Sequence, residues 1–392
     1  MFRFLTSGES HGPSLATIIE GLPAGMPLTA EPIDAHLRRR QGGYGRGARQ
    51  KIETDSAEIL SGVRFGETLG SPVTLLVRNR DWENWKDRMR IEPRPDGDEG
   101  PKAVTVPRPG HADYAGLVKY GHDDIRNVLE RASARNTATL VAVGAVAREL
   151  LGLFGIRIVS HVVRIGSEAA PDVAGITADE LYEQAEASPV RCADADTSER
   201  IVALIDQCKR RGDTLGGVFE VVAFGLPVGL GSYVHWDKRI DGRVAQALMS
   251  IQAIKGVEFG MGFASGAVPG SQVHDEFTPG DDAHGGGVQR LSNRAGGTEG
   301  GITNGEPLVV RAVMKPIATL MRQLQSVNLQ TGEAAPAFAE RSDVCAVPAA
   351  AVVGEAMVGI ALAQAFQEKF GGDSLRQMRA AYEAYRATYQ KP

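Results

Sequence analysis

The chain of 392 residues is 43% hydrophobic and 23% charged, which is the ordinary composition of a soluble globular protein. Its formal net charge of −5 argues against a general nucleic-acid binder or a protein that coats anionic membranes. Its three cysteines, Cys192, Cys208 and Cys345, are too few and too scattered for a disulfide framework or a zinc site. This usage fits a reducing cytosol, so we expect a soluble, cytoplasmic protein.

Five short runs rich in Val, Ile and Leu predict strands, because β-branched residues favour extended backbone. In chain order they are LATIIEGL (15–22), SPVTLLV (71–77), IRIVSHVVRI (156–165), GGVFEVVAFGL (216–226) and EPLVVRAVM (306–314).

Three segments predict helices, and two of them are dense in alanine, which favours helix. They are residues 137–154, 239–253 and 349–370. The two Ala-rich segments end in Phe-Gly, where Gly155 and Gly371 are expected to supply left-handed caps.

Residues 346–366 are the nearest approach to a membrane span, but Glu355 near their middle favours a helix buried in protein. Long connections rich in glycine or proline separate the predicted elements, and loops of this length are usually functional or disordered. The three connections start with the segments RRRQGGYGRGARQK (38–51), IEPRPDGDEG (91–100) and DDAHGGGVQR (281–290). No change of composition marks a linker, so we expect one layered domain over residues 1–392.

The pentapeptide GESHG places His11 between Gly8 and Gly12, beside Ser10. Glycines let the backbone turn sharply and approach another group, and a histidine exchanges protons near neutral pH. The alternative interpretation is a strand followed by a polar turn.

Arginines occur in four further motifs, and arginine is suited to a bidentate grip on phosphate or carboxylate. RRRQGGYGRGAR combines them with glycines; its alternatives are a solvated basic loop or an RNA-binding segment. ERASAR and ERSD each precede a predicted helix, whose N-terminus attracts anions. The alternatives are a plain N-cap for Ser133 and a salt bridge or N-cap for Asp343. RPGHADY adds Arg108 and His111 in a constrained turn.

Dinucleotide, P-loop and nucleophile-elbow motifs are absent from the sequence, and the histidines lack the paired spacing of a metal site. Many arginines with two histidines in glycine-bounded turns suit a small polyanionic substrate that loses an anionic leaving group.

Seven motifs in a fixed order along nearly the whole chain resemble the chorismate synthase family. They are GESHG, RRRQGGYGRGAR, RPGHADY, ERASARNTA, NRAGGTEGG, KPIAT and RSDVCAVPAA. The resemblance implies a lyase that makes chorismate by a 1,4-anti elimination of phosphate from 5-enolpyruvylshikimate 3-phosphate, with reduced FMN as cofactor. This is the last common step of the shikimate pathway to aromatic amino acids. It also implies an α+β fold, a single-domain layered β-α-β sandwich with central Ala-rich helices, assembled as a homotetramer.

The resemblance also assigns roles to single residues. His11 would protonate the departing phosphate, His111 would donate a proton to the reduced flavin, and Asp343 would assist deprotonation at the flavin N5 side. The substrate-binding set is Ser10, Arg46, Arg49, Arg108, Ser133, Arg135 and Arg341, with Arg131 assisting. The FMN-binding set is Arg131, Ala132, Ser133, Gln252, Ala253, Gly300, Lys315, Pro316, Ile317, Ala318, Thr319 and Arg341. Positions assigned to NADPH are Arg40 and Arg46.

One departure is that the family commonly has Glu where this chain has Asn136, so a carboxylate near the flavin or substrate would be lost. Two other functions stay open at this point. A flavin reductase that oxidises NADPH would use the same flavin pocket without needing His11. A nucleic-acid binding protein would use the Arg-Gly loop, but the net negative charge weighs against it, and we expect neither nucleic acid nor membrane as a partner.

Overall fold

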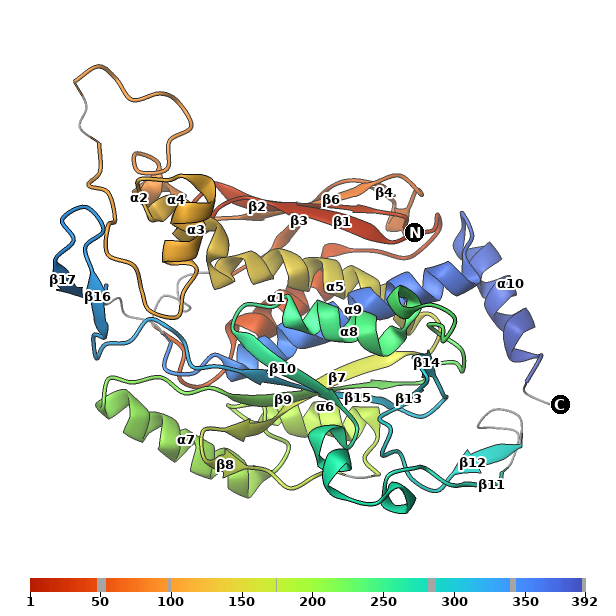
Figure 1. Cartoon of the computed structure of the whole chain (residues 1–392). Coiled ribbons are helices and arrows are strands. Elements are labelled where there is room, and N and C mark those ends of the chain that lie inside the picture. The colour runs from red at the N-terminus through yellow and green to blue at the C-terminus, as the bar shows by residue number, and fades with distance from the viewer. Residues whose placement is uncertain (48–53, 98–99, 174, 281–286, 339–342, 390–392) are drawn as a thin grey trace.

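The computed structural model describes residues 1–47, 54–97, 100–173, 175–280, 287–338 and 343–389, which form three layers with helices between two sheets (Figure 1). The first sheet has the order β1 (Arg3–Ser7), β2 (Ser14–Glu20), β6 (Val73–Arg78), β3 (Ala57–Ser61). The second has the order β10 (Ile254–Phe259), β15 (Leu308–Met314), β9 (Gly217–Phe224), β7 (Arg157–Ile165), β8 (Glu168–Ala169). Neighbouring strands are antiparallel throughout both sheets.

The middle layer contains α1 (Ala30–Gln41), α5 (Thr137–Gly152), α8 (Ile240–Met249) and α9 (Val347–Phe370). The outer face of the second sheet is covered by α6 (Ala178–Ala187), with α7 (Ala195–Arg210) beside it (Figure 1). The smaller helices are α2 (Trp82–Trp85), α3 (Asp113–Tyr120), α4 (Arg126–Ala132) and α10 (Leu375–Arg386). Short hairpins pair β4 (Val63–Arg64) with β5 (Glu67–Thr68), β11 (Phe277–Pro279) with β12 (Val288–Arg290), β13 (Thr298–Glu299) with β14 (Ile302–Thr303), and β16 (Gln325–Val327) with β17 (Ala334–Pro336).

Burial follows the layers. In β2, Leu15, Thr17 and Ile19 are buried while Ile18 is exposed, because one face of the first sheet packs on α5 and the other meets solvent. Strand β9 is buried along nearly its whole length, since α9 covers one face and Leu181 of α6 packs against the other. The hydrophobic core therefore extends from the first sheet through the helices to the second sheet.

Helix α9 is long and apolar enough to cross a membrane, with a mean hydropathy of 1.7, yet it lies buried between the sheets, as the sequence predicts. Its contact with α5 is close, because a Cβ placed on Gly144 would lie 2.3 Å from the Cβ of Ala356. Any larger residue than glycine at this crossing would push the two helices apart.

All five predicted strands and all three predicted helices are present, and so is the layered β-α-β arrangement. Helix α8 ends earlier than expected, because Ala253 has a left-handed φ of +67° that helical backbone excludes. The predicted left-handed cap at Gly371 is wrong: its φ is −8°, and its N–H still donates to the carbonyl oxygen of Gln367. Gly155 does have a φ of +78°, although α5 ends before it.

The predicted loop at residues 38–51 is wrong at its start, because α1 continues through Gln41. Its later part, residues 48–53, lies outside the described residues, as do residues 281–286 of the last predicted long connection.

Candidate active site

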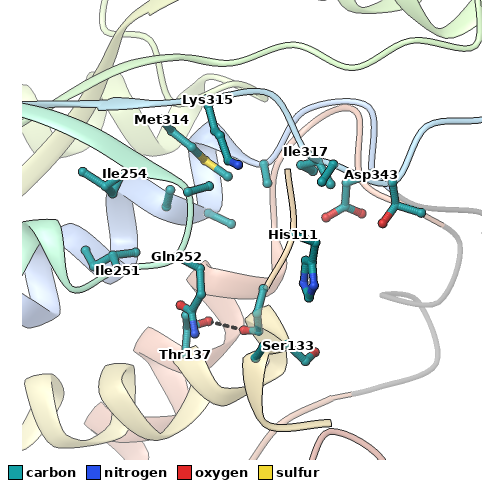
Figure 2. A pocket seen from close by; sticks show the side chains of 18 of the residues that line it. His111, Ser133, Thr137, Ile251, Gln252, Ile254, Met314, Lys315, Ile317 and Asp343 are labelled. Atoms are coloured by element: carbon teal, nitrogen blue, oxygen red, sulfur yellow. Dashed lines mark hydrogen bonds between the residues drawn. The ribbon is translucent and has the colours of Figure 1, made fainter. Parts of the chain in front are cut away.

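A cavity of about 580 Å³ lies at the end of the sandwich where the two buried helices α5 and α9 begin (Figures 1 and 2). Its wall combines the first turns of these helices with loops that leave both sheets. The predicted site residues that line it are Ser10, Arg40, Arg46, Arg108, His111, Ala132, Ser133, Arg135, Gln252, Ala253, Lys315, Pro316, Ile317, Ala318, Thr319 and Asp343. Six of the seven motifs, which are scattered along the sequence, thus contribute to one cavity, and NRAGGTEGG does not line it.

Two arginines in the cavity wall share one buried carboxylate. Asp55 is 4% exposed, and its oxygens lie 2.5 Å and 2.6 Å from Nη1 of Arg135. Arg40 approaches the same carboxylate at 3.4 Å and donates from Nε to the Thr137 hydroxyl at 2.8 Å. Arg40 and Arg135 therefore both bring guanidinium groups to the wall of the cavity, where they can bind an anion. Asp55 is a site residue that the sequence reasoning missed.

Asp343 lies in another part of the wall, next to the Arg-Gly loop. Its Oδ1 accepts the N–H of Gly47 at 2.6 Å, and its Oδ2 lies 3.2 Å from Nε of Arg46. The structure therefore bears out the salt bridge proposed for Asp343, and it also places this carboxylate on the cavity (Figure 2).

His111 lies in a turn organised by Asp113, whose side chain is 1% exposed. The Asp113 carboxylate accepts from His111 Nδ1, and from the backbone N–H and Nε of Arg108 at 2.9 Å and 3.0 Å. Burial alone would raise the pKa of Asp113, but the bonds from His111 and Arg108 outweigh it and lower the pKa to about 2. Arg108 also donates to the Thr319 hydroxyl at 3.1 Å.

Ser133 caps the short 3₁₀ turn Ala134–Asn136, since its hydroxyl accepts the N–H of Arg135 at 3.2 Å. The same hydroxyl donates to the Ser10 hydroxyl at 3.0 Å, so the predicted N-cap and the cavity position coexist. This contact links the turn before α5 to the GESHG segment.

His11 does not line the cavity, whereas its neighbour Ser10 does. Its Nδ1 is 2.9 Å from a carboxylate oxygen of Glu130, and its ring stacks on Trp85. Neither Glu130 nor Trp85 was identified from the sequence. The signal for Glu130 was its place in ERASAR, where we singled out only the arginines and the serine.

Arg131 turns away from the cavity and holds the end of β1. Its guanidinium donates to the Thr6 carbonyl and hydroxyl oxygens at 2.9 Å and 2.7 Å, and to the Gly8 carbonyl oxygen at 3.1 Å. Asn136 accepts a further bond from Arg131 at 3.1 Å. Asn136, where the family commonly has Glu, thus contacts Arg131 and does not line the cavity. The missing carboxylate would therefore affect Arg131 and not a bound ligand directly.

Gln252 and its neighbours, between α8 and β10, form another part of the cavity wall (Figure 2). The Oε1 atom of Gln252 is buried and has no hydrogen-bond partner within the described residues. Ala253 carries the left-handed φ noted above, and its carbonyl oxygen accepts the N–H of Lys315 at 2.9 Å. Lys315 Nζ donates to the Gly110 carbonyl oxygen, which joins this wall to the turn of His111. Backbone strain at a cavity is typical of a binding site.

Besides His11 and Arg131, three further predicted residues are not among those described as lining the cavity. Gly300 lies in the turn between β13 and β14, where Tyr233 is its neighbour, and it does not line the cavity. Arg49 and Arg341 lie outside the described residues.

The arrangement fits a flat aromatic group and a polyanion together. Ile251, Ile254, Met314, Ile317 and Val353 supply apolar surface, while arginines and Lys315 supply the positive charge. A buried acceptor without a partner, such as Gln252 Oε1, suits a ring N–H of a bound cofactor. Across the described ranges, no group of three His, Cys, Asp or Glu side chains is placed to hold a metal ion.

The chain is similar to known proteins over nearly its whole length. The family model described as "Chorismate synthase" matches residues 2–367. Curated relatives with that name are 58% identical in Trichlorobacter lovleyi, 56% in Pelobacter propionicus and 54% in Enterococcus faecalis, each alignment covering 98% of both chains. A solved structure titled "Crystal Structure of Chorismate Synthase" is 45% identical, with a TM-score of 0.79 over 99% of this chain and 98% of that one.

Proposed function

We propose, because the chain belongs to the chorismate synthase family, that the cavity at the start of α5 and α9 is where it releases phosphate from 5-enolpyruvylshikimate 3-phosphate to form chorismate. Members of this family are lyases of the shikimate pathway. The observation that carries the assignment of this site is the convergence of Arg40, Arg108 and Arg135 with His111 on one cavity.

The substrate carries two carboxylates and a phosphate, and the arginines of the cavity wall suit these groups. Arg46, Arg108 and Arg135 would bind them, as would Arg49 and Arg341 of the undescribed segments, with Ser10 and Ser133 donating hydrogen bonds. Guanidinium groups hold such anions in fixed orientations through paired N–H bonds. Fixed orientation matters here because the hydrogen and the phosphate leave from opposite faces of the ring.

Reduced FMN, when bound, supplies electron density to the substrate as phosphate leaves. Gln252 and Ala253, the segment from Lys315 to Thr319, and the backbone at Ala132 and Ser133 would hold it. The apolar side chains described above would exclude water from its ring. The fit rests on the buried Gln252 Oε1 and on the size of the cavity.

Three side chains would handle protons. His11 would give a proton from Nε2 to the departing phosphate oxygen, and Ser10 would bind alongside. His111 would donate a proton at the flavin, with Asp113 ionised behind it. Asp343, which lies on the cavity, would assist deprotonation on the flavin side. Positioned proton transfer of this kind contributes about a hundred- to ten-thousand-fold to a rate.

We further propose that the protein is a cytoplasmic homotetramer of a single domain that includes residues 1–392. A continuous hydrophobic core supports the single domain. NADPH is the proposed reductant, with Arg40 and Arg46 as its contacts.

The test is to mix the purified protein anaerobically with chemically reduced FMN and the substrate, and to measure chorismate and phosphate. We expect equal amounts of both products, and none with oxidised FMN alone. A second arm with NADPH and oxidised FMN tests whether the protein reduces its own flavin. Absence of product from a folded protein that binds reduced FMN would contradict the proposed function.

A further inference from the structure

The imidazole of His11 is held by one carboxylate from a distant part of the chain. Glu130 lies at the end of α4, and its two oxygens are 2.9 Å and 3.0 Å from His11 Nδ1. The same carboxylate accepts the backbone N–H of His11 at 2.8 Å. Because Glu130 binds both the ring and the backbone, it fixes where the GESHG turn lies and how the ring is rotated.

Trp85 of α2 fixes the plane of that ring. The two ring centroids are 3.7 Å apart, with 25° between the planes. The indole is itself anchored, because its Nε1 donates to Asp81 at 2.9 Å and the guanidinium of Arg126 lies 5.3 Å from its centroid. One face of the imidazole is therefore covered, and the His11 side chain is only 12% exposed.

The charges around the ring determine which nitrogen carries a proton. Burial raises the pKa of Glu130, but the bonds and charge of His11 outweigh it and lower the pKa, with help from Arg126 at 3.2 Å. Glu130 is thus an ionised acceptor, and an acceptor at Nδ1 requires a hydrogen on Nδ1. The remaining nitrogen, Nε2, is buried and has no hydrogen-bond partner within the described residues.

We propose that Glu130 is a positioning residue that holds His11 with its proton-transfer atom, Nε2, directed away from Glu130. The proposal rests on the proposed function, in which His11 donates a proton to the leaving phosphate. In that step the Nε2–H bond breaks and an O–H bond forms on phosphate. The ring is left neutral with its hydrogen on Nδ1, and no proton passes to Glu130.

Charged side chains from two helices surround the ring. Glu130 and Arg126 belong to α4, while Asp81 and Arg88 contact Trp85 of α2. Of these, only Glu130 is in direct contact with the imidazole. Loss of its negative charge would weaken the charge-assisted bond that holds the hydrogen of His11 on Nδ1.

The deciding variant is Glu130→Gln, which keeps the size and one acceptor oxygen but removes the charge. With reduced FMN and saturating substrate, we expect kcat to fall about a hundredfold with KM changed less than about threefold. Glu130→Asp should recover part of kcat because it restores the charge. Glu58→Gln, at an ion pair on the sheet surface, is the matched control and should leave kcat and KM unchanged.

Several outcomes would overturn the proposal or separate it from the proposed function. If the unaltered protein makes no chorismate, the proposed function fails. If it does, and Glu130→Gln keeps the normal kcat, the positioning role is wrong. Should Glu130→Gln not fold, ¹⁵N spectra of histidine-labelled protein, with His11→Ala to assign the signal, decide the matter. A neutral ring protonated at Nδ1 is expected, and a ring protonated at Nε2 would refute the proposal.

Discussion

Helix α1 carries two consecutive arginines whose side chains lie in different surroundings, one in the protein core and one at the cavity. Arg39 enters the protein core and binds the buried Glu355 through two nitrogens, at 2.7 Å and 2.8 Å. Arg40 reaches the cavity, where it shares Asp55 with Arg135. The first group is a core cluster of Arg39, Arg148, Arg191, Glu186 and Glu355, and the second is a cavity cluster of Arg40, Arg135 and Asp55.

The two clusters differ in what surrounds the arginines. In the core cluster three guanidiniums contact two carboxylates, and Arg148 and Arg191 also donate to backbone carbonyl oxygens, which completes an internal network. In the cavity cluster two guanidiniums contact one carboxylate beside open space. The comparison teaches that an arginine run in a sequence does not distinguish stabilising from ligand-binding residues; the buried acids around each side chain do.

Breaking the core cluster should have the largest effect. Glu355→Ala leaves three arginines without their shared carboxylate, and we expect the free energy of unfolding to fall by about 3–5 kcal/mol. Urea unfolding followed by circular dichroism measures this. The exposed pair of Arg3 and Glu20 is the control, and Glu20→Ala should cost at most about 1 kcal/mol. Equal losses in the two variants would show that the core cluster does not stabilise the fold.

Changing the cavity cluster should affect activity and not stability. Arg135→Ala removes a proposed ligand of the substrate, and charge-assisted bonds are worth about 1.5–3 kcal/mol. We therefore expect kcat/KM to fall by about tenfold to 150-fold in the reduced-FMN assay. The urea midpoint should stay close to normal, because Asp55 keeps Arg40 as a partner. An unchanged kcat/KM would remove Arg135 from substrate binding.

A smaller effect is expected from the pH response of the core cluster. His36 Nδ1 accepts from Arg39 and Arg148 at 2.9 Å and 3.0 Å. Burial, together with the charges of these arginines, lowers the pKa of His36 from 6.5 to about 3. The unfolded chain therefore binds a proton on His36 below pH 6.5 that the folded chain does not bind until about pH 3. Folding stability must decrease as the pH falls through this window.

His36→Asn keeps an acceptor oxygen but cannot titrate there. Between pH 7 and pH 5, the unaltered protein should lose about 1–2 kcal/mol more unfolding free energy than the variant. Urea titrations at both pH values give the comparison. Parallel losses in the two proteins would contradict the assignment of the acid response to His36.

The smallest effect is expected at Arg38, which precedes both arginines in α1 and is exposed. Arg38→Ala should change the unfolding free energy by less than about 0.5 kcal/mol and leave kcat/KM unaltered. A large loss of activity would show that the exposed face of α1 also contributes to the site, and the distinction between the two clusters would then not hold.

The sequence predicted those parts of the fold whose signal is local. Strands such as β7 and β9 contain long β-branched runs because both faces of their sheet are covered, and α9 is apolar all round because it is buried all round. The end of helix α1 was missed because Arg38–Gln41 resembles the glycine-rich loop that follows. Strands β1, β3 and β10 were missed because they are short and lack β-branched runs.

The site was predicted from motifs, and its missed members are those that act through long-range contacts. Glu130 meets His11 across 119 positions of the chain, and Asp55 meets Arg135 across 80. Nothing local to Asp55 or Trp85 distinguishes either from an ordinary surface residue. Arg39 shows the opposite error. It belongs to the motif RRRQGGYGRGAR, which suggested contact with an anionic ligand, but in the structure it binds Glu355.

The common starting point of α5 and α9 has a consequence for how fast the substrate arrives. Each helix directs the positive end of its dipole toward the cavity. No proton can remove this positive potential, so it persists at any pH at which the fold survives. A chain of net charge −5 thus presents a local attractive field to a polyanion, and the association rate should fall steeply as salt is added.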